Sequence, residues 1–222
     1  MKRTLDVMVA LAGLLVLWPV LLFLAIAVRL TSPGPALYRG ERVGRYGKSF
    51  RILKFRSMVA NAESIGGSST ADGDCRITPI GKFMRKYKLD ETPQLFNVLS
   101  GSMSLVGPRP EVREYTDLYT EEELPIFRLQ PGITDWASIW NSDEGAVLSG
   151  HPDPDEAYMT LIRPTKLALQ LKYVEDHSVM TDLKIIFYTA RKVISPTWLP
   201  TELAPYGNLL AGDEPRQMSK AA

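Results

Sequence analysis

The sequence predicts a helix-rich α/β protein with few short strands, attached to a membrane by its N-terminal segment. The chain opens with 22 consecutive residues that carry no charged side chain, residues 7–28, with Pro19 near their middle. Behind this run, short helical patterns alternate with turn-forming residues, and only two stretches have strand character. The chain has 222 residues, 45% of them hydrophobic, so the part behind the apolar run can bury a core of its own.

The apolar run is long enough to reach across a bilayer. A helix rises about 1.5 Å per residue, so the run reaches roughly 33 Å, close to the hydrocarbon thickness of a membrane. A simple spanning helix would place the N-terminus on the far side. A re-entrant hairpin would instead break at Pro19, because proline removes a backbone donor, and would return to the side that it entered. Prolines are also tolerated in spanning helices, so both topologies stay open.

A cleaved signal peptide is a third interpretation of the same segment. Lys2 and Arg3 would form its basic start, and the Ala-Ile-Ala sequence at residues 25–27 would form a small-residue cleavage site. Against this interpretation, the run is longer than a usual signal core and Arg29 follows it at once.

Positive charge is concentrated directly behind the apolar run. Residues 29–56 hold eight cationic side chains and a single acidic one, Glu41. The positive-inside rule expects such a flank on the cytoplasmic side, and the cations would also suit anionic headgroups or a phosphorylated substrate. A solvated basic face is the alternative. The net charge of +1 gives no indication of nucleic-acid binding, and the single cysteine, Cys75, excludes a disulfide framework and fits a reducing cytosol.

Turn-forming residues divide the first half of the globular part. The sequence TSPGP at residues 31–35 ends the N-terminal helix. Short strands are expected at residues 36–39 and 49–55, on either side of a turn at residues 44–47. The small, polar, glycine-rich residues 61–73 predict a mobile loop.

Helices dominate the second half. Helical patterns cover residues 80–88, 93–99, 112–128, 161–175 and 181–194. A rigid extended turn at residues 107–110 and a loop at residues 141–155 separate them. The last helix carries one apolar face, formed by Leu183, Ile186, Phe187, Ala190 and Ile194. We expect this face to pack on the core, with a position in the headgroup plane as the alternative. After Ser195, a proline-rich tail is expected to be loosely docked or disordered.

Two adjacent carboxylates are the strongest candidates for chemistry. Asp90 and Glu91 follow a basic helix and precede Pro93, which marks the start of the next helix. A helix N-terminus offers free amide donors and the positive end of the dipole, so a carboxylate there stays ionised. An ionised carboxylate can act as a nucleophile or bind a divalent cation. The alternative is that Asp90, Glu91 and Thr92 are ordinary helix-capping residues.

Arg109 is the second candidate. Prolines on both sides hold its backbone still, so its planar guanidinium would meet an oxyanion at low entropic cost. An exposed arginine on a surface turn is the alternative. His151 and His177 lack ligand spacing, so we expect no zinc site. The sequence also lacks a phosphate-loop motif and a dinucleotide-binding fingerprint.

Two long segments resemble the signature of the bacterial sugar transferases, the monotopic phosphoglycosyl transferases. They are LDETPQLFNVL at residues 89–99 and GSMSLVGPRP at residues 101–110. Weaker matches are Lys2-Arg3 with Asp6, FRILKFRSM at residues 50–58, PGIT at residues 131–134 and DLKI at residues 182–185. The resemblance covers roughly residues 1–194.

The sequence departs from the pattern of this family at several positions. Trp18, where the family often has serine, precedes Pro19. Asp135 stands where the family usually has glycine, and the polar residues 138–142 also differ. Gln170 stands near the place of a family aspartate that precedes the late tyrosine. These departures leave the carboxylate pair intact and bear on sugar recognition.

The resemblance implies a specific membrane architecture. It places a re-entrant membrane helix at residues 1–30, a small cytoplasmic catalytic domain with interfacial helices at residues 31–194, and a C-terminal tail at residues 195–222. The helix would break at Pro19, and the residues that accompany this hairpin are Lys2, Arg3 and Asp6. The expected location is the cytoplasmic face of the bacterial inner membrane.

The resemblance also implies a reaction. Enzymes of this family move a phosphosugar from a UDP-sugar onto polyprenyl (undecaprenyl) phosphate and release UMP, the first membrane step of glycoconjugate or exopolysaccharide synthesis. Asp90 would be the nucleophile of a covalent aspartyl-phosphosugar intermediate, and Glu91 its partner in metal or proton handling. Asp90 and Glu91 would bind Mg²⁺. The groups expected at the donor phosphates are Arg85, Arg109, Lys54 and Pro108.

The expected partners follow from this reaction: a UDP-sugar donor, a polyprenyl phosphate acceptor and membrane lipid, without nucleic acid. The sequence leaves a homodimer open and does not define the sugar or the pathway. A non-enzymatic, membrane-anchored protein whose basic flank binds lipid is the competing hypothesis. A secreted binding protein, released after signal cleavage, is a third.

Overall fold

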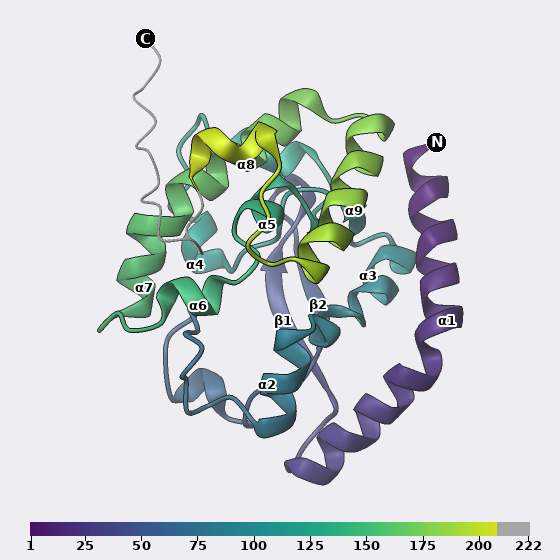
Figure 1. Ribbon diagram of the computed structural model, residues 1–222, viewed down its shortest axis with the longest axis vertical. Helices are drawn as coiled ribbons and strands as arrows, with labels where there is room; N and C mark the ends of the chain where they lie inside the picture. Colours follow the sequence, from purple (N-terminus) through teal and green to yellow (C-terminus); the bar gives the residue numbers. More distant parts are fainter. Residues whose placement is uncertain (208–222) are drawn as a thin grey trace.

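The computed structural model describes residues 1–207, without the side chain of Glu63; the last part of the predicted tail, residues 208–222, lies outside the described residues. A long helix, α1 (Lys2–Thr31), runs along one edge of the molecule, and the globular part lies beside it (Figure 1). Among the described residues, α1 is the one helix that is long and apolar enough to cross a membrane. The prediction of a helix-rich protein with few short strands is confirmed.

The helix α1 continues through Pro19 without an interruption. Its ribbon bends along its length but does not turn back on itself (Figure 1). Proline removes one backbone hydrogen bond and crowds the preceding turn, which bends a helix more often than it ends it when the flanking residues are good helix formers. The chain therefore has a bent helix where a complete break was expected.

The predicted end of this helix is confirmed. The backbone N–H of Ser32 still donates to the carbonyl of Val28 at 3.2 Å, and the chain then becomes extended. The buried guanidinium of Arg56 donates to the carbonyl oxygens of Ser32 (2.8 Å) and Pro33 (2.5 Å). One cation of the basic flank thus fixes the junction between α1 and the globular part.

An antiparallel hairpin follows. Strands β1 (Leu37–Val43) and β2 (Ser49–Phe55) pair from Leu37–Phe55 at one end to Val43–Ser49 at the other. The turn between them includes a short 3₁₀ helix, η1 (Arg45–Gly47), in which Gly47 has a φ of 72°. Both predicted strands are confirmed, and β1 extends four residues further than predicted because the ladder continues up to the turn.

Short helices surround the hairpin. The elements between β2 and the second sheet are η2 (Ala62–Ser64), α2 (Pro79–Lys86), η3 (Leu89–Glu91) and α3 (Gln94–Ser100). The later elements are α4 (Arg113–Thr116), η4 (Leu124–Arg128), α5 (Trp136–Trp140), α6 (Glu144–Leu148), α7 (Pro154–Ala157), a π-helical turn η5 (Tyr158–Ile162), α8 (Arg163–Asp176), α9 (Val179–Ile194) and η6 (Thr201–Tyr206). In Figure 1, α3 points toward α1, and α9 lies beside the N-terminal half of α1.

A second, two-stranded parallel sheet was not predicted. It consists of β3 (Ser104–Val106) and β4 (Gly132–Thr134). The backbones at Gly107 and Gly132 approach so closely that a Cβ on Gly132 would come within 2.1 Å of the Gly107 nitrogen. Three-residue strands that are mostly buried show no alternation, so hydrophobic periodicity cannot reveal them. The GPRP turn, at residues 107–110, follows β3 directly, so this sheet positions the turn in the interior of the protein.

Residues 112–128 have the predicted helical content, in the form of two short helices, α4 and η4, with turns between them. The expected loop at residues 141–155 contains α6, whose N-terminus is capped by the Asp143 carboxylate through a hydrogen bond from the Ala146 N–H at 3.3 Å.

The glycine-rich loop at residues 61–73 is tied to the globular part. The guanidinium of Arg76 donates to the carbonyls of Ala62 (3.2 Å) and Gly67 (3.0 Å). The backbone N–H of Ser69 donates to Asp155 at 2.8 Å. The mobility predicted for this loop stays a prediction, and these contacts limit how far it can move.

The helix α9 and the segment behind it differ from the expectation. Ile185 of α9 is fully buried, whereas Leu183, Phe187 and Ile194 are 45%, 64% and 85% exposed. Most of the predicted apolar face therefore points outward, because the buried side of α9, with Asp182 and Ile185, lies one residue earlier along the helix. Ile186 is the member of the predicted face that packs against the core. The described part of the tail is firmly docked: Leu203 is fully buried in the main core.

Candidate active site

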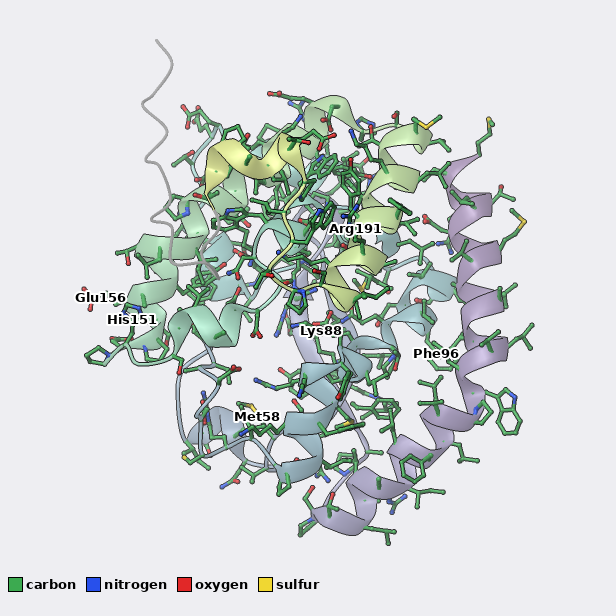
Figure 2. All side chains as sticks on the ribbon, viewed as in Figure 1. Met58, Lys88, Phe96, His151, Glu156 and Arg191 are labelled. Atoms are coloured by element: carbon green, nitrogen blue, oxygen red, sulfur yellow. The ribbon has the colours of Figure 1, made fainter. Side chains whose placement is uncertain are left out.

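The two adjacent carboxylates lie in η3, the single turn that joins α2 to α3. Lys88, just before this turn, has a φ of 56°, a left-handed conformation that reverses the chain at the end of α2. In Figure 2, Lys88 lies near the centre of the molecule, whereas His151 lies at the edge opposite α1. Asp90 is only 7% exposed. The carboxylate pair is therefore in the interior, at the meeting point of α2, α3 and the hairpin.

Glu91 is held by two cations from other parts of the chain. The Arg109 guanidinium contacts both of its carboxylate oxygens, one of them through Nη1 at 3.0 Å. The Lys54 ammonium, from β2, donates to Oε1 at 2.8 Å. Although burial pushes the pKa of Glu91 up, Arg109 and Lys54 together hold that pKa well below its usual range. Glu91 is a fixed negative charge.

Asp90 has a different environment. Its Oδ1 atom is buried and has no hydrogen-bond partner among the described residues. Burial, reinforced by the negative charge of Glu91, raises the pKa of Asp90, although the nearby cations Lys54 and Arg85 oppose this shift. Burial therefore has the largest influence on the pKa of Asp90, and it favours the protonated carboxyl, whereas the sequence predicted that a helix N-terminus would favour the ionised form.

Helix capping does not explain the pair. Pro93 occupies the cap position of α3, and no side chain caps either η3 or α3. The carboxylate of Glu91 instead reaches Arg109 and Lys54, which lie 18 and 37 residues away in the sequence. The interpretation of these residues as ordinary caps is wrong.

The remaining predicted phosphate-binding groups lie around the pair. Arg85 of α2 donates from Nε to the Ser57 hydroxyl at 2.9 Å, and its positive charge acts on Asp90. Burial lowers the pKa of Arg85 and also that of Lys54. Pro108 contributes its carbonyl, which accepts from the Gly132 N–H at 3.0 Å, so it shapes the backbone next to Arg109. The structure thus brings Lys54, Arg85 and Arg109 to the two carboxylates.

The exposed-arginine alternative for Arg109 is wrong as well. Its Nη1 also donates to the Ile133 carbonyl at 3.2 Å, so strand β4 helps to direct the guanidinium. Neither this contact nor the contact of Ser57 with Arg85 could be predicted from the sequence, because both depend on chain segments that meet only in the fold.

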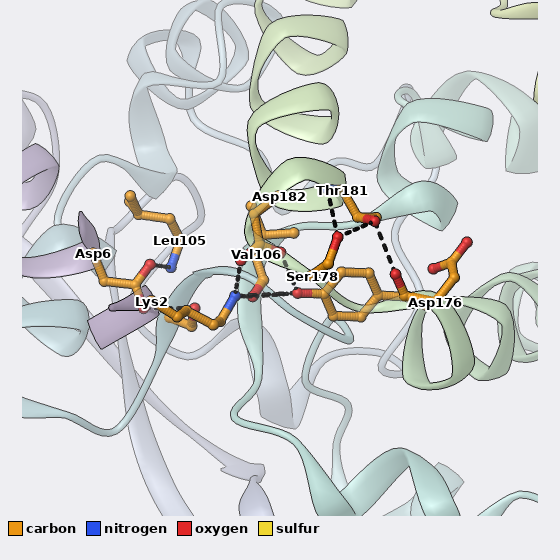
Figure 3. Close-up of polar contacts among 10 residues, drawn as sticks. Lys2, Asp6, Leu105, Val106, Asp176, Ser178, Thr181 and Asp182 are labelled. Carbon is orange, nitrogen blue, oxygen red and sulfur yellow. Dashed lines mark hydrogen bonds and ion pairs between the residues drawn. The ribbon is translucent and has the colours of Figure 1, made fainter. Parts of the chain in front are cut away.

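The charged residues at the start of α1 form an anchor on the globular part (Figure 3). The Lys2 ammonium donates to the Asp182 carboxylate (2.6 Å) and to the Val106 carbonyl (2.9 Å). The Asp6 carboxylate accepts from the Ser104 hydroxyl at 2.8 Å. Arg3 donates to two backbone carbonyls at the end of α3. Lys2, Arg3 and Asp6 therefore each bind a different part of the globular unit and together hold the start of α1 on it.

An apolar groove lies between α1 and the globular part. It has a volume of about 350 Å³, and nine hydrophobic residues or prolines line it: Leu14, Trp18, Leu21, Leu22, Ala25, Leu37, Phe55, Pro93 and Phe96. Figure 2 shows Phe96 between the globular part and α1. Pro93, one of the residues that line the groove, is three residues from Asp90 in the sequence.

Residues 1–207 contain no group of three or more His, Cys, Asp or Glu side chains that could hold a metal ion by themselves. Asp90 offers a free carboxylate oxygen, whereas both oxygens of Glu91 are occupied by cations. Magnesium commonly binds through one or two carboxylates together with the phosphates of a substrate. The donor set fits a magnesium ion of that kind.

The fold and the site define a protein with a buried carboxylate pair and clustered cations, placed beside a helix suited to a membrane. The sequence profile of the bacterial sugar transferase family matches residues 1–196. The chain belongs to this family, as the signature segments predicted.

Three relatives act on different sugars according to their names. One is the UDP-N-acetylgalactosamine-undecaprenyl-phosphate N-acetylgalactosaminephosphotransferase of Aeromonas hydrophila, 36% identical over 87% of this chain and 44% of the relative. Another is the undecaprenyl-phosphate galactose phosphotransferase of Salmonella typhimurium, 35% identical over 87% of this chain and 40% of the relative.

The third is the UDP-glucose:undecaprenyl-phosphate glucose-1-phosphate transferase of Caulobacter vibrioides, 36% identical over 87% of this chain and 70% of the relative. The chain thus spans less than half the length of the Aeromonas and Salmonella proteins. The enzyme class predicted from the signature segments, a phosphoglycosyl transferase, is the one that these relatives share.

Proposed function

We propose that this protein transfers a phosphosugar from a UDP-sugar to polyprenyl phosphate through a covalent intermediate on Asp90. The observation that carries the proposal is the unequal environment of the two adjacent carboxylates. Glu91 is fixed by Arg109 and Lys54, whereas Asp90 keeps a buried oxygen without a hydrogen-bond partner. One carboxylate is thus organised as a stable charge, and its neighbour is left available for bond formation.

In the first step, a carboxylate oxygen of Asp90 attacks the phosphorus that carries the sugar. A new P–O bond to Asp90 forms, the bond from that phosphorus to UMP breaks, and UMP leaves with the electron pair. The nucleophile carries a negative charge, so no proton has to move before the attack. Because its surroundings solvate it poorly, little solvent has to be displaced from the attacking oxygen.

In the second step, an oxygen of polyprenyl phosphate attacks the same phosphorus. The bond to Asp90 breaks, the carboxylate is regenerated, and the product is a polyprenyl-diphosphate-sugar. Each step exchanges one P–O bond for another. Charge develops on phosphate oxygens in both steps, and fixed cations stabilise such charge without reorganising.

The fixed cations that would stabilise this charge are Arg85, Arg109 and Lys54. Each is fixed by contacts to Ser57 or Glu91 before any substrate arrives. Prearranged cations of this kind suit the diphosphate of a nucleotide-sugar better than flexible surface lysines do. Magnesium, when bound to Asp90 and the substrate phosphates beside Glu91, would neutralise part of the diphosphate charge.

The apolar groove supports a lipid acceptor. A chain of isoprene units is apolar throughout, and the groove offers about 350 Å³ between α1 and the globular part. Pro93, which lines the groove, is three residues from Asp90, so we expect the phosphate of a lipid bound in the groove to lie toward Asp90. The outer face of α1 is exposed and apolar, with Leu15, Val16 and Leu30 each at least 74% exposed, as a lipid-facing helix requires.

The contacts at the two ends of α1 support a re-entrant arrangement. At the start of α1, Lys2 binds Asp182, and at its end Arg56 binds the carbonyl of Ser32. A helix whose two ends are held by one globular unit keeps both ends on the same side of a membrane. A simple spanning helix would separate them, and a cleaved signal peptide would remove Lys2. We place the globular part on the cytoplasmic face of the inner membrane, as the basic flank favours.

The test is UMP release by membrane-reconstituted protein with Mg²⁺, undecaprenyl phosphate and a panel of UDP-sugars, with Asp90→Asn as the matched control. The proposal expects UMP from at least one donor with the wild-type protein and none above background with the variant. A non-enzymatic, lipid-binding protein would release no UMP and would tolerate the substitution. The panel also identifies the sugar, which the three named relatives leave open.

A further inference from the structure

We infer that Asp135 and Gln170 are positioning residues for Arg109: they hold its backbone and thereby direct its guanidinium onto Glu91. This inference rests on the proposed function. The hydrogen bonds of the two side chains lead to Arg109, to Ser138 and to each other, and none leads to Asp90 or Glu91, so we expect their effect on the reaction to pass through Arg109.

The backbone of Arg109 is held on both sides. Its N–H donates to Asp135 Oδ2 at 3.1 Å, and its carbonyl accepts from Gln170 Nε2 at 3.2 Å. The same Nε2 atom donates to Asp135 Oδ2 at 3.3 Å, which closes a ring of three hydrogen bonds. Asp135 and Gln170 are both fully buried, so water does not compete for these bonds.

The two side chains are themselves fixed. Asp135 caps α5, and its Oδ1 accepts from the Ser138 backbone N–H and hydroxyl, both at 2.7 Å. Gln170 projects from α8, which packs against α5. Side chains from the start of α5 and from α8 therefore hold the backbone of a single residue on both of its sides. With Pro108 and Pro110 as its neighbours, Arg109 has little freedom to swing away from Glu91.

The chemistry of the ring requires one carboxylate and one amide. Asp135 is an acceptor only, and the amide of Gln170 supplies the two donated hydrogen bonds.

If Gln170 acts through Arg109, the effect of a substitution at Gln170 on kcat depends on whether Arg109 is present. Gln170→Glu places a second buried carboxylate next to Asp135 and the Arg109 carbonyl. The new carboxylate repels both of these groups. We expect kcat to fall at least tenfold, while the KM for the UDP-sugar changes less than threefold, because the guanidinium is displaced but the site stays open. Gln170→Met, which removes the donor without adding charge, is the second variant in case Gln170→Glu does not fold.

The experiment measures UMP release by the full chain in membranes for each variant, alone and combined with Arg109→Ala. In the Arg109→Ala background, Gln170→Glu and Gln170→Met are expected to reduce kcat by less than twofold further, because the group they position is gone.

A matched control separates positioning from a general loss of packing. Asn97 also bridges two backbone groups from a buried position, through the Leu53 N–H and the Arg51 carbonyl, both at 2.8 Å. Asn97→Asp is therefore expected to lower Tm, but its effect on kcat should multiply with that of Arg109→Ala. If the Gln170 effects multiply with Arg109→Ala in the same way, the positioning role is wrong. If the wild-type protein releases no UMP with any donor, the proposed function fails instead.

Discussion

Arg109 and Glu91 form a two-pronged ion pair in which the guanidinium faces both carboxylate oxygens, and Lys54 completes the contact. The pair lies one residue from Asp90, whose Oδ1 is buried without a hydrogen-bond partner. A fixed ionic cluster beside a free carboxylate oxygen is the geometric basis of the proposed reaction.

The ion pair predicts that arginine is required at residue 109 for its shape and not only for its charge. Arg109→Ala and Glu91→Gln are each expected to lower kcat about 10²–10³-fold, because one prearranged charge is lost. Arg109→Lys should recover less than a tenth of the wild-type rate, since an ammonium cannot contact both oxygens side by side. UMP release at saturating donor measures this, and full activity of Arg109→Lys would contradict the geometric argument.

Asp90→Asn is expected to abolish transfer and to raise Tm at pH 7–8. Because folding raises the pKa of Asp90, protonated Asp90 favours the folded state; this stabilisation is complete below the unfolded pKa of about 3.9 and disappears as the pH rises through the folded pKa. At neutral pH the buried charge therefore destabilises the protein, and asparagine removes it. Thermal unfolding in detergent from pH 4 to pH 8 measures the effect. An Asp90→Asn variant less stable than the wild type at pH 8 would oppose this account.

The raised pKa of Asp90 also predicts the pH profile of the reaction. Since the ionised carboxylate attacks, kcat/KM should fall as the pH falls through the pKa of Asp90, at a higher pH than for an ordinary aspartate. Lys54 opposes the upward shift, so Lys54→Gln should move this acid limb to still higher pH. Lys48→Gln, on the exposed turn of the hairpin, is the control and should leave the limb in place. An acid limb that moves down in Lys54→Gln would contradict the assignment.

The contacts at both ends of α1 predict that residue 4 and the globular part lie on the same side of the membrane. Cys75 is exposed and is the single cysteine of the chain, so it reports on the globular part without further change. Thr4→Cys in a Cys75→Ser background reports on the start of α1. A membrane-impermeant thiol reagent should label both proteins in inside-out vesicles and neither in right-side-out vesicles. Labelling of the two cysteines from opposite sides would establish a spanning helix.

The part of the site that lies in one continuous segment could be predicted from the sequence. The apolar run, the breaker at residues 31–35 and the strand at residues 49–55 are local patterns, and local chemistry decides them. Asp90 and Glu91 stand in a long signature segment, so their importance was visible. The different roles of the two carboxylates could not be predicted, because the pKa of each depends on burial and on cations that the fold brings from other segments.

The missed features have a common physical cause. Strands β3 and β4 are three residues long and mostly buried, so no alternation marks them. The short helix α6 depends on a single aspartate cap within a polar segment. The hydrogen bonds of Asp135 and Gln170 to the Arg109 backbone join segments 26 and 61 residues apart. Each of these features depends on contacts that hydrophobic periodicity in the sequence does not reveal.

The central claim is that the phosphosugar is carried on Asp90 itself. The most direct measurement is to incubate the protein with a UDP-sugar labelled in the sugar, without acceptor, to quench in acid, and to map the label by mass spectrometry of the peptides. The account predicts one mole of UMP per mole of active protein and a phosphosugar adduct on the peptide that contains Asp90, absent in Asp90→Asn. UMP release that occurs only when polyprenyl phosphate is also present, with no adduct on that peptide, would contradict it.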